Sequence, residues 1–222
     1  MISLGIDCGT QSLKTVALDG DSGKIVASAS KAYGLAEGLP PGHAEQDPAV
    51  WWDALVETVG KVVADLGPRK AEIVALGVSG QQHGFVALDA DHRVIRPAKL
   101  WCDTSTTAQC AEIRSKLGGR DETVTLVGND MLPGFTAPKI LWLKQNEPDN
   151  FARLAHIALP HDFLNLRLTG SLRMEFGDAS GTALLDVRTR TWSKEACRAI
   201  DEDLLEKLPP AGSSLVAAGT IL

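Results

Sequence analysis

The feature that most constrains this chain is its N-terminal segment, in which an apolar run leads into an acid and then into small polar residues. The apolar run Met1–Ile6 and the β-prone run Thr15–Leu18 flank the segment Asp7–Ser12. Two short apolar runs joined by turn residues predict a β-hairpin, with Asp7–Ser12 at its tip. We therefore expect the fold to begin with antiparallel strands.

The tip of this hairpin carries groups that suit a phosphate. Glycine adopts backbone angles closed to other residues, so we expect Gly9 to let successive N–H groups converge on an anion. Thr10 and Ser12 add hydroxyl donors, and Asp7 offers a carboxylate for Mg²⁺, directly or through water. An ordinary hairpin turn is the alternative, because Asp and Gly are common in turns.

Length and composition limit the classes of protein. The 222 residues allow one large domain or two small ones. The net charge of −6 argues against nucleic acid or an anionic membrane as the main partner. No apolar run approaches the ~20 residues that span a bilayer. The four cysteines lack C-x-x-C spacing and no signal peptide is visible, so we expect a soluble cytoplasmic protein with reduced thiols.

The rest of the chain predicts an α/β fold, with a mixed sheet of about five strands flanked by helices. Asp47 and Pro48 suit the start of a helix that the apolar spacing continues to about Leu66. The other expected strands are 24–30, 72–78, 85–88, 94–101 and 156–159, and the other expected helices are 106–117, 148–154, 161–168, 192–200 and 203–208, with a short helix beginning near Pro138.

Two polar segments follow predicted strands and are suited to a ligand. In the first, Gln81, Gln82 and His83 lie between two glycines, where amide and imidazole groups supply donors and acceptors. In the second, Trp101 offers an apolar face for sugar C–H groups and Asp103 accepts hydrogen bonds from hydroxyls. The alternatives are a histidine in an ordinary turn and a tryptophan in the core.

The N-terminal pattern Asp7-x-Gly9-Thr10-x-Ser12-x-Lys14 resembles the phosphate loop of the actin, Hsp70 and hexokinase superfamily. The variant present here is most similar to that of the FGGY carbohydrate kinases. Four later stretches resemble the xylulokinase branch of that family: Glu45-Gln46-Asp47-Pro48 with Trp51-Trp52, Gly80–Gly84, Leu100–Thr104, and Asn129–Asn146, which fits the family signature from Gly134 onward. Gln82 and Cys102 depart from the residues usual in the family.

The resemblance implies a ribonuclease H-like lobe, a mixed sheet flanked by helices, that works with ATP and Mg²⁺. It implies Asp7 as the catalytic and metal-binding acid. It also implies a small-molecule sugar as partner, with D-xylulose favoured over ribulose, fuculose, gluconate or glycerol, no nucleic acid or membrane, and a homodimer left open. A non-catalytic sugar-binding relative is the alternative from another class. The remaining expected contacts are Gly9, Thr10, Gln11, Ser12 and Lys14 for the nucleotide phosphates, and Gln82, His83, Trp101 and Asp103 for the sugar.

The resemblance covers residues 1–222 as the N-terminal, sugar-binding lobe of such a kinase. The family's second lobe, with the aspartate that acts as general base and the glycine-rich adenosine site, has no counterpart in these residues. We therefore expect this chain to be inactive by itself and the complete protein to be the enzyme.

Overall fold

The computed structural model describes residues 1–222 and has a mixed sheet at the N-terminal end. The sheet has four strands, in the order β3 (Lys24–Ala32), β2 (Ser12–Asp19), β1 (Ile2–Cys8) and β5 (Ile73–Gly80). β1 pairs antiparallel with β2 and parallel with β5. The predicted hairpin and the mixed sheet are confirmed, whereas the expected fifth strand is absent, because the chain leaves this sheet after β5.

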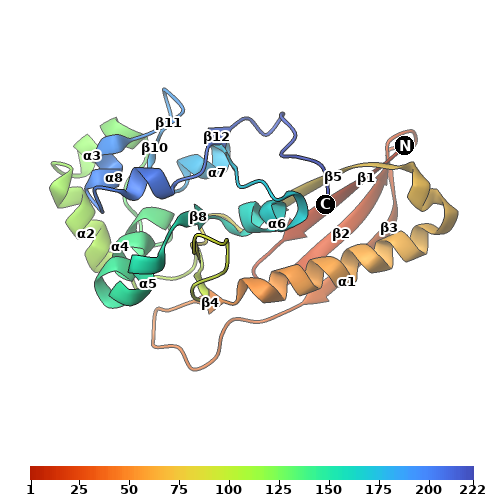
Figure 1. Cartoon of the computed structure of the whole chain (residues 1–222), viewed down its shortest axis with the longest axis horizontal. Helices are drawn as coiled ribbons and strands as arrows, with labels where there is room; N and C mark the ends of the chain where they lie inside the picture. Colours follow the sequence, from red (N-terminus) through yellow and green to blue (C-terminus); the bar gives the residue numbers. More distant parts are fainter.

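Helix α1 (Pro48–Leu66) covers one face of the sheet (Figure 1). It begins as predicted, since the Asp47 side chain accepts a hydrogen bond from the Ala49 N–H at 2.9 Å. Its buried side, including Trp51 and Val62, packs on alternate buried residues of β1 and β2. The opposite face of β1 carries Asp7, which is exposed. Burial on one side of the sheet therefore turns the hairpin acid toward solvent.

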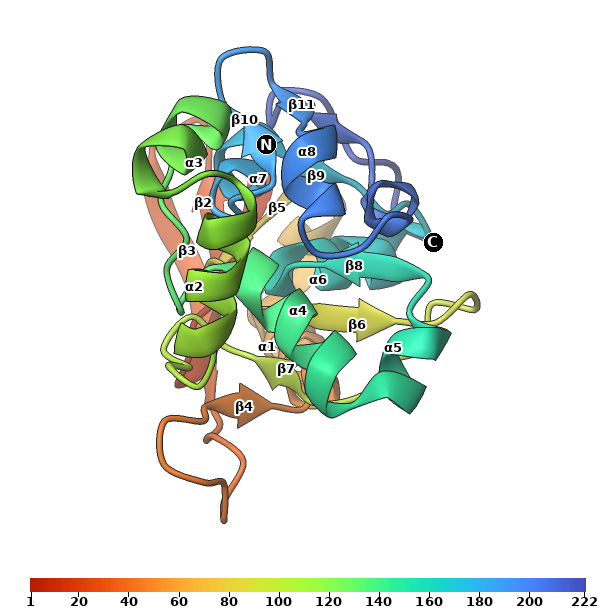
Figure 2. The same ribbon diagram turned by 90° about the vertical axis from the view of Figure 1, so that its left-hand side faces the viewer.

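A second region, mostly helical, lies beside the sheet (Figures 1 and 2). Its helices surround a core of their own, to which Phe85, Ile113, Met131 and Ile140 belong. The helices of this region are α2 (Thr107–Lys116), α3 (Arg120–Val127), α4 (Thr136–Asn146), α5 (Pro148–Arg153), α7 (Phe176–Ser180) and α8 (Lys194–Arg198). Helix α6 (Pro160–Thr169) contacts β5 and α1 and so joins the two regions.

Short strands and 3-10 turns complete the second region and its border with the first. β6 pairs with β8 in a separate small sheet, which is where the predicted strand 85–88 goes. The other pairs are β4 with β7, β9 with β12, and β10 with β11. These elements are β4 (Glu45–Gln46), η1 (Gly67–Glu72), β6 (Val86–Leu88), β7 (Ala98–Lys99), β8 (His156–Ala158), β9 (Met174–Glu175), β10 (Leu185–Asp186), β11 (Thr191–Trp192), η2 (Leu204–Lys207) and β12 (Ala211–Gly212).

The sequence predictions differ from the structure mainly in the C-terminal part. Trp192 was expected to begin a helix, but it pairs with Leu185 in the β10–β11 ladder, and α8 begins at Lys194. Helix α3 was not expected, because its polar sequence lacks an apolar stripe of helical period. Of the predicted extended run 94–101, only Ala98–Lys99 forms a strand.

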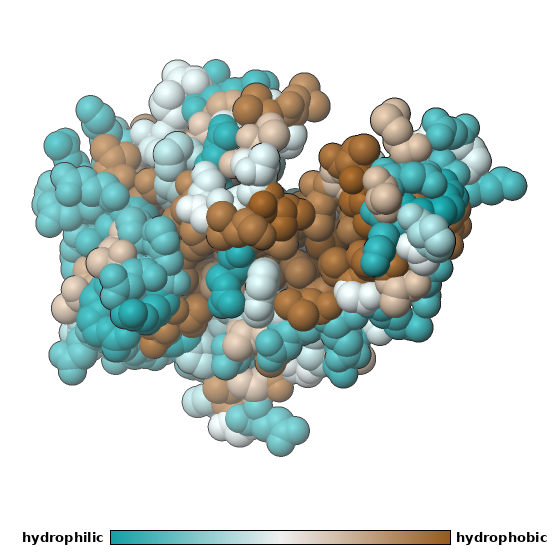
Figure 3. Space-filling model, turned by 45° about the vertical axis from the view of Figure 1, so that its right-hand side comes forward, coloured by the Kyte–Doolittle hydropathy of each residue, from teal (hydrophilic) through white to brown (hydrophobic).

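Hydrophobic side chains are exposed in the hollow seen in Figure 3. A groove of about 360 Å³ beside β5 is lined by residues 73–76 and 217–221, among others, and Val74 within it is 63% exposed.

None of the helices is both long enough and apolar enough to cross a membrane.

Candidate functional site

Two adjoining pockets at the tip of the β1–β2 hairpin bring together most of the predicted site residues. The first, of about 460 Å³, is lined by Asp7, Gly9, Thr10, Gln11, Ser12, Lys14, Ser30 and Trp101. The second, of about 390 Å³, is lined by Asp7, Gly9, Thr10, Gly80, Gln81, Gln82, His83 and Trp101. Asp7, Gly9, Thr10 and Trp101 line both pockets, so the expected phosphate loop and the expected sugar loops adjoin. Asp103 lines neither.

The hairpin loop is shaped by main-chain contacts. The Gly9 N–H donates to the Ser12 carbonyl at 3.0 Å, and the Tyr33 hydroxyl donates to the Gly9 carbonyl at 2.7 Å. Gly9 does not adopt left-handed backbone angles, which corrects the expected reason for glycine at this position. A Cβ atom there would lie 3.1 Å from the Ser12 carbonyl oxygen, so the close approach of two backbone segments is what favours glycine.

Buried Gln46 holds this loop from behind. Its Nε2 donates to the Thr10 carbonyl at 2.7 Å, and its Oε1 accepts hydrogen bonds from Trp51 Nε1 at 2.9 Å and Gln81 Nε2 at 3.1 Å. The Thr10 hydroxyl donates to Gln81 Oε1 at 3.2 Å and accepts from Trp101 Nε1 at 2.9 Å. The Glu-Gln-Asp-Pro segment and the tryptophan after it thus order the loop that carries Asp7.

His83 faces the second pocket from the turn after β5. Its φ angle is +62°, in the left-handed region that non-glycine residues rarely adopt. Its ring lies 4.7 Å from that of Phe135, and its Nδ1 is buried without a hydrogen-bond partner within the chain. Burial, together with the nearby Lys139 charge, lowers the pKa of His83, so the imidazole is neutral and can donate or accept a hydrogen bond.

Trp101 and Asp103 occupy different positions, although both were expected to contact the ligand. Trp101 is 50% exposed in the pocket wall. Asp103 is fully buried, and its Oδ2 accepts from Lys99 Nζ at 2.9 Å and from the Ala44 N–H at 3.0 Å. Burial opposes ionisation, but hydrogen bonds from Ser105, Ala44 and Lys99 hold the pKa of the Asp103 carboxyl below its usual range. Asp103 therefore lies behind the Trp101 loop, with its carboxylate engaged inside the protein.

Lys99 fills a cluster of buried metal-ligating side chains. His43, Glu45 and Asp103 bring their donor atoms within 4.8 Å of one another. The Lys99 ammonium lies 3.2 Å from His43 Nδ1, 3.2 Å from Glu45 Oε1 and 4.0 Å from the centroid of the Trp142 ring. This cluster therefore already holds a cation. The exposed Asp7 carboxylate, with the Thr10 and Ser12 hydroxyls, is the set of hard oxygen donors that suits Mg²⁺.

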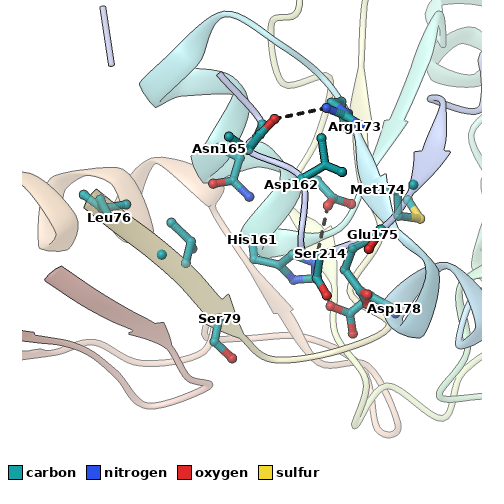
Figure 4. A pocket seen from close by; sticks show the side chains of 17 residues that line it. Leu76, Ser79, His161, Asp162, Asn165, Arg173, Met174, Glu175, Asp178 and Ser214 are labelled. Atoms are coloured by element: carbon teal, nitrogen blue, oxygen red, sulfur yellow. Dashed lines mark hydrogen bonds and ion pairs between the residues drawn. The ribbon is translucent and has the colours of Figure 1, made fainter. Parts of the chain in front are cut away.

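A further pocket, of about 430 Å³, lies along β5 (Figure 4). There His161 Nε2 is 2.8 Å from Asp178 Oδ2 and 3.3 Å from Asp162 Oδ1. Burial disfavours the imidazolium, but the two carboxylates raise the pKa of His161 to about 9. None of the predicted site residues lines this pocket.

Comparison with known proteins identifies the family. The N-terminal domain model of the FGGY family of carbohydrate kinases matches residues 2–221. The chain belongs to this family. Xylulose kinase of Bacillus subtilis is 37% identical over 219 residues, which are 99% of this chain and 43% of that protein. Xylulose kinase of Escherichia coli is 37% identical over 200 residues, which are 89% of this chain and 40% of that protein. The chain thus spans about two fifths of the length of these relatives.

Solved structures of FGGY kinases have the same fold. A xyloylose kinase from Brucella ovis superposes with a TM-score of 0.92 at 34% identity, covering 100% of this chain and 45% of that one. A ligand-bound xylulose kinase from Lactobacillus acidophilus gives a TM-score of 0.90 at 27% identity, covering 99% and 44%. A gluconate kinase from the same organism gives 0.89 at 26% identity, covering 100% and 44%. The expected actin-like lobe with a mixed sheet flanked by helices is confirmed.

Some residues that build this FGGY site were not selected from the sequence. Gln46 holds the hairpin loop, and Lys99 and Lys139 bind the segments that carry Trp101 and His83 from the interior. The Lys99 position could have been noticed, because a lysine between Ala98 and Leu100 in an apolar run requires a buried partner. Gln46 and Lys139 lie in stretches that carry the resemblance, but their roles depend on contacts between distant segments.

Proposed function

We propose that the complete protein transfers the γ-phosphoryl group of ATP to D-xylulose, giving xylulose 5-phosphate and ADP. Residues 1–222 would act as its sugar-binding lobe. The observation that carries the proposal is the pair of adjoining pockets, which share Asp7, Gly9, Thr10 and Trp101. The xylulose kinases among the relatives support the choice of sugar.

The hairpin tip would bind the phosphate end of the nucleotide. The Ser12 hydroxyl would donate to a phosphate oxygen, and the Thr10 hydroxyl would do so by exchanging its hydrogen bond to Gln81 for one to the phosphate, with Gly9, Gln11 and Lys14 around them. Asp7 would hold Mg²⁺, directly or through water, and the ion would supply neutralisation of the charge on the transferring phosphoryl group. The Tyr33 and Gln46 hydrogen bonds to the loop support this role, because they fix the donors before the nucleotide arrives.

The second pocket would bind the sugar. The Trp101 ring would lie against C–H groups, and Gln82 and His83 would form hydrogen bonds with hydroxyl groups. We propose that Asp103 acts on the sugar indirectly, through the position of Trp101, because its carboxylate is buried and bound to Lys99.

The reaction requires two reacting groups in line more than it requires covalent chemistry from the protein. The oxygen of the sugar's primary hydroxyl would bond to the γ-phosphorus while the bond from that phosphorus to the ADP oxygen breaks. We propose that the hydroxyl proton passes to a carboxylate in a second lobe, outside residues 1–222, which would also bind adenosine. Closure of the two lobes would exclude water and so prevent hydrolysis of ATP.

The test is coupled ADP release by the complete protein with xylulose, ribulose, gluconate and glycerol as separate substrates. A strong preference for xylulose supports the proposal. Activity with another of these substrates would leave the assignment as a kinase intact but would change its sugar. The departures from the family at Gln82 and Cys102 would then account for the different specificity. A folded protein that binds ATP and phosphorylates none of them contradicts the proposal.

We further propose the cytoplasm as the site of action, where ATP is available and the four free cysteines stay reduced.

A further inference from the structure

Lys139, in the first turns of helix α4, places a charged group in the interior next to the sugar pocket. Its side chain is fully buried. Its Nζ donates to two main-chain carbonyls, those of His83 and Gly134, each at 2.7 Å. These carbonyls belong to loops that are about 50 residues apart in the sequence, so one ammonium group joins two separate loops.

One of these loops presents His83. The left-handed backbone of this histidine is strained and persists only where the surroundings enforce it. The Thr136 hydroxyl donates to the same His83 carbonyl at 3.2 Å. Gly181 lies against the ring, since a Cβ atom there would come within 2.2 Å of His83 Cε1. The histidine is therefore held at its backbone by α4 and at its ring by the segment after α7.

The other loop supports Trp101. A Cβ atom on Gly134 would lie 2.7 Å from the Trp101 carbonyl oxygen, so the backbones of these two residues touch. Because Lys139 fixes the Gly134 carbonyl, it also limits the position of the Trp101 backbone. Through its two hydrogen bonds, Lys139 connects the segments that carry His83 and Trp101, both of which line the second pocket.

The burial of this ammonium is costly. Desolvation lowers the pKa of Lys139 to about 7, although the negative charge of Asp103 acts in the opposite direction. A buried apolar side chain would fill the same space without that cost. Lys144 shows the contrast within the same helix, because it binds the Ile200 carbonyl at 2.9 Å and Asp201 at 2.7 Å with its side chain 39% exposed.

We propose that Lys139 is a positioning residue that sets the separation of His83 and Trp101 across the sugar pocket, acting only through the His83 and Gly134 carbonyls. Its effect on sugar affinity rests on the proposed function, whereas its effect on the two loops does not. The side chain is buried away from the pocket surface and lines neither pocket.

The experiment compares Lys139→Met with Lys144→Met in the complete protein. Each variant removes one lysine of α4 that binds a carbonyl, and only the first lies behind the pocket. Hydrogen exchange of peptides covering 80–86 and 132–136 measures how readily the two loops open. Steady-state kinetics measure the KM for the sugar. In Lys139→Met we expect faster exchange in both peptides. If the correct loop arrangement is then one tenth populated, the KM for the sugar rises about tenfold with little change in the KM for ATP.

In the control variant Lys144→Met, the exchange rates of both peptides and the KM for the sugar should stay within twofold of the wild type. Unchanged exchange in Lys139→Met overturns the proposal. Faster exchange together with no kinase activity in the wild type supports the positioning role and counts against the proposed function instead. If Lys139→Met does not fold, Thr136→Val and Gly181→Ala decide, because they act on the same histidine while Lys139 still binds the His83 and Gly134 carbonyls. Unchanged 80–86 exchange and sugar KM in both would overturn the proposal.

Discussion

The hairpin tip that carries Asp7 and the loops that carry His83 and Trp101 face the same pockets but are held in different ways. The hairpin tip is fixed by strand pairing from Cys8–Leu13 to Ile2–Asp19 and by neutral hydrogen bonds from Tyr33 and Gln46. The other two loops depend on buried ammonium groups. Strand pairing is local in sequence, whereas Lys99 also contacts Glu45 and Lys139 also binds His83, each more than 50 residues away in the chain.

The two kinds of support should respond differently to substitution. A hairpin with many cross-strand pairs tolerates the loss of one side chain. A buried charge does not tolerate the loss of its partner, because the remaining charge is left desolvated. We therefore expect substitutions at the hairpin tip to change chemistry with little change in folding, and substitutions behind the sugar loops to change folding and sugar binding together.

The largest effect is expected from Asp7→Ala in the complete protein. Loss of the acid at the phosphate loop should lower kcat by about a thousandfold and change the sugar KM little. The exposed position of Asp7 predicts an unchanged midpoint of urea unfolding. Ser3→Ala, on the same exposed side of β1, serves as the control and should keep full activity. A rise in sugar KM as large as the fall in kcat would contradict this division of roles.

The next effect is on stability and comes from Lys99→Met. The substitution leaves Glu45 and Asp103 buried without their ammonium, which should reduce the free energy of unfolding by about 3 kcal/mol. Urea unfolding measures it. Lys61→Met is the control, because Lys61 forms only an exposed ion pair with Asp65 and should cost less than about 0.5 kcal/mol. Equal losses in the two variants would show that the buried cluster does not stabilise the sugar side of the pocket.

His161→Gln should destabilise the protein in a pH-dependent way. The folded-state pKa of about 9 lies above the ordinary 6.5, so the stabilisation is complete below pH 6.5 and is lost as the pH rises through 9. We expect a deficit of about 2 kcal/mol at pH 6 that disappears by about pH 10. Unfolding of the variant and wild type across this range tests it, with His156→Gln as control, because burial lowers the pKa of His156. A deficit that does not depend on pH would contradict the ion pair with Asp178.

The smallest effect is expected from His83→Ala, which should raise the sugar KM by about tenfold and leave kcat within about threefold. His92→Ala is a matched control, because His92 also has a left-handed backbone (φ 59°) and lies outside both pockets. The two variants therefore change the backbone preference equally, and only one removes a side chain from the pocket. If both raise the KM alike, the effect of His83 is conformational.

Much of the first region could be predicted from the sequence. The hairpin and helix α1, with Asp47 as its cap, follow from alternation, helical period and capping, all of which act between residues close in the chain. The grouping of Asp7, Thr10, Gln82, His83 and Trp101 was also expected, from a resemblance in motifs.

The placement of Asp103 could not be predicted. From the sequence, the carboxylate beside Trp101 was assigned to the ligand. Lys99 lies only four residues before it, but the burial of this pair depends on contacts with Ala44 and Glu45, more than 50 residues earlier in the chain. The number of strands in the main sheet could not be predicted either. The strand β6 pairs with β8, about 70 residues later in the chain, and so does not join the main sheet. The polar helix α3 was missed because its stability comes from packing and from its glycine ends.

By itself, the sequence determined the family, the N-terminal hairpin with its exposed acid, and the helix that covers one face of the sheet. The tertiary structure alone decided which charged side chains reach the pocket and which support it from within. The physical reason is that burial depends on segments far apart in the chain. Lys139 and Lys99 lose their water only when those segments meet, and the strong hydrogen bonds that compensate exist only then.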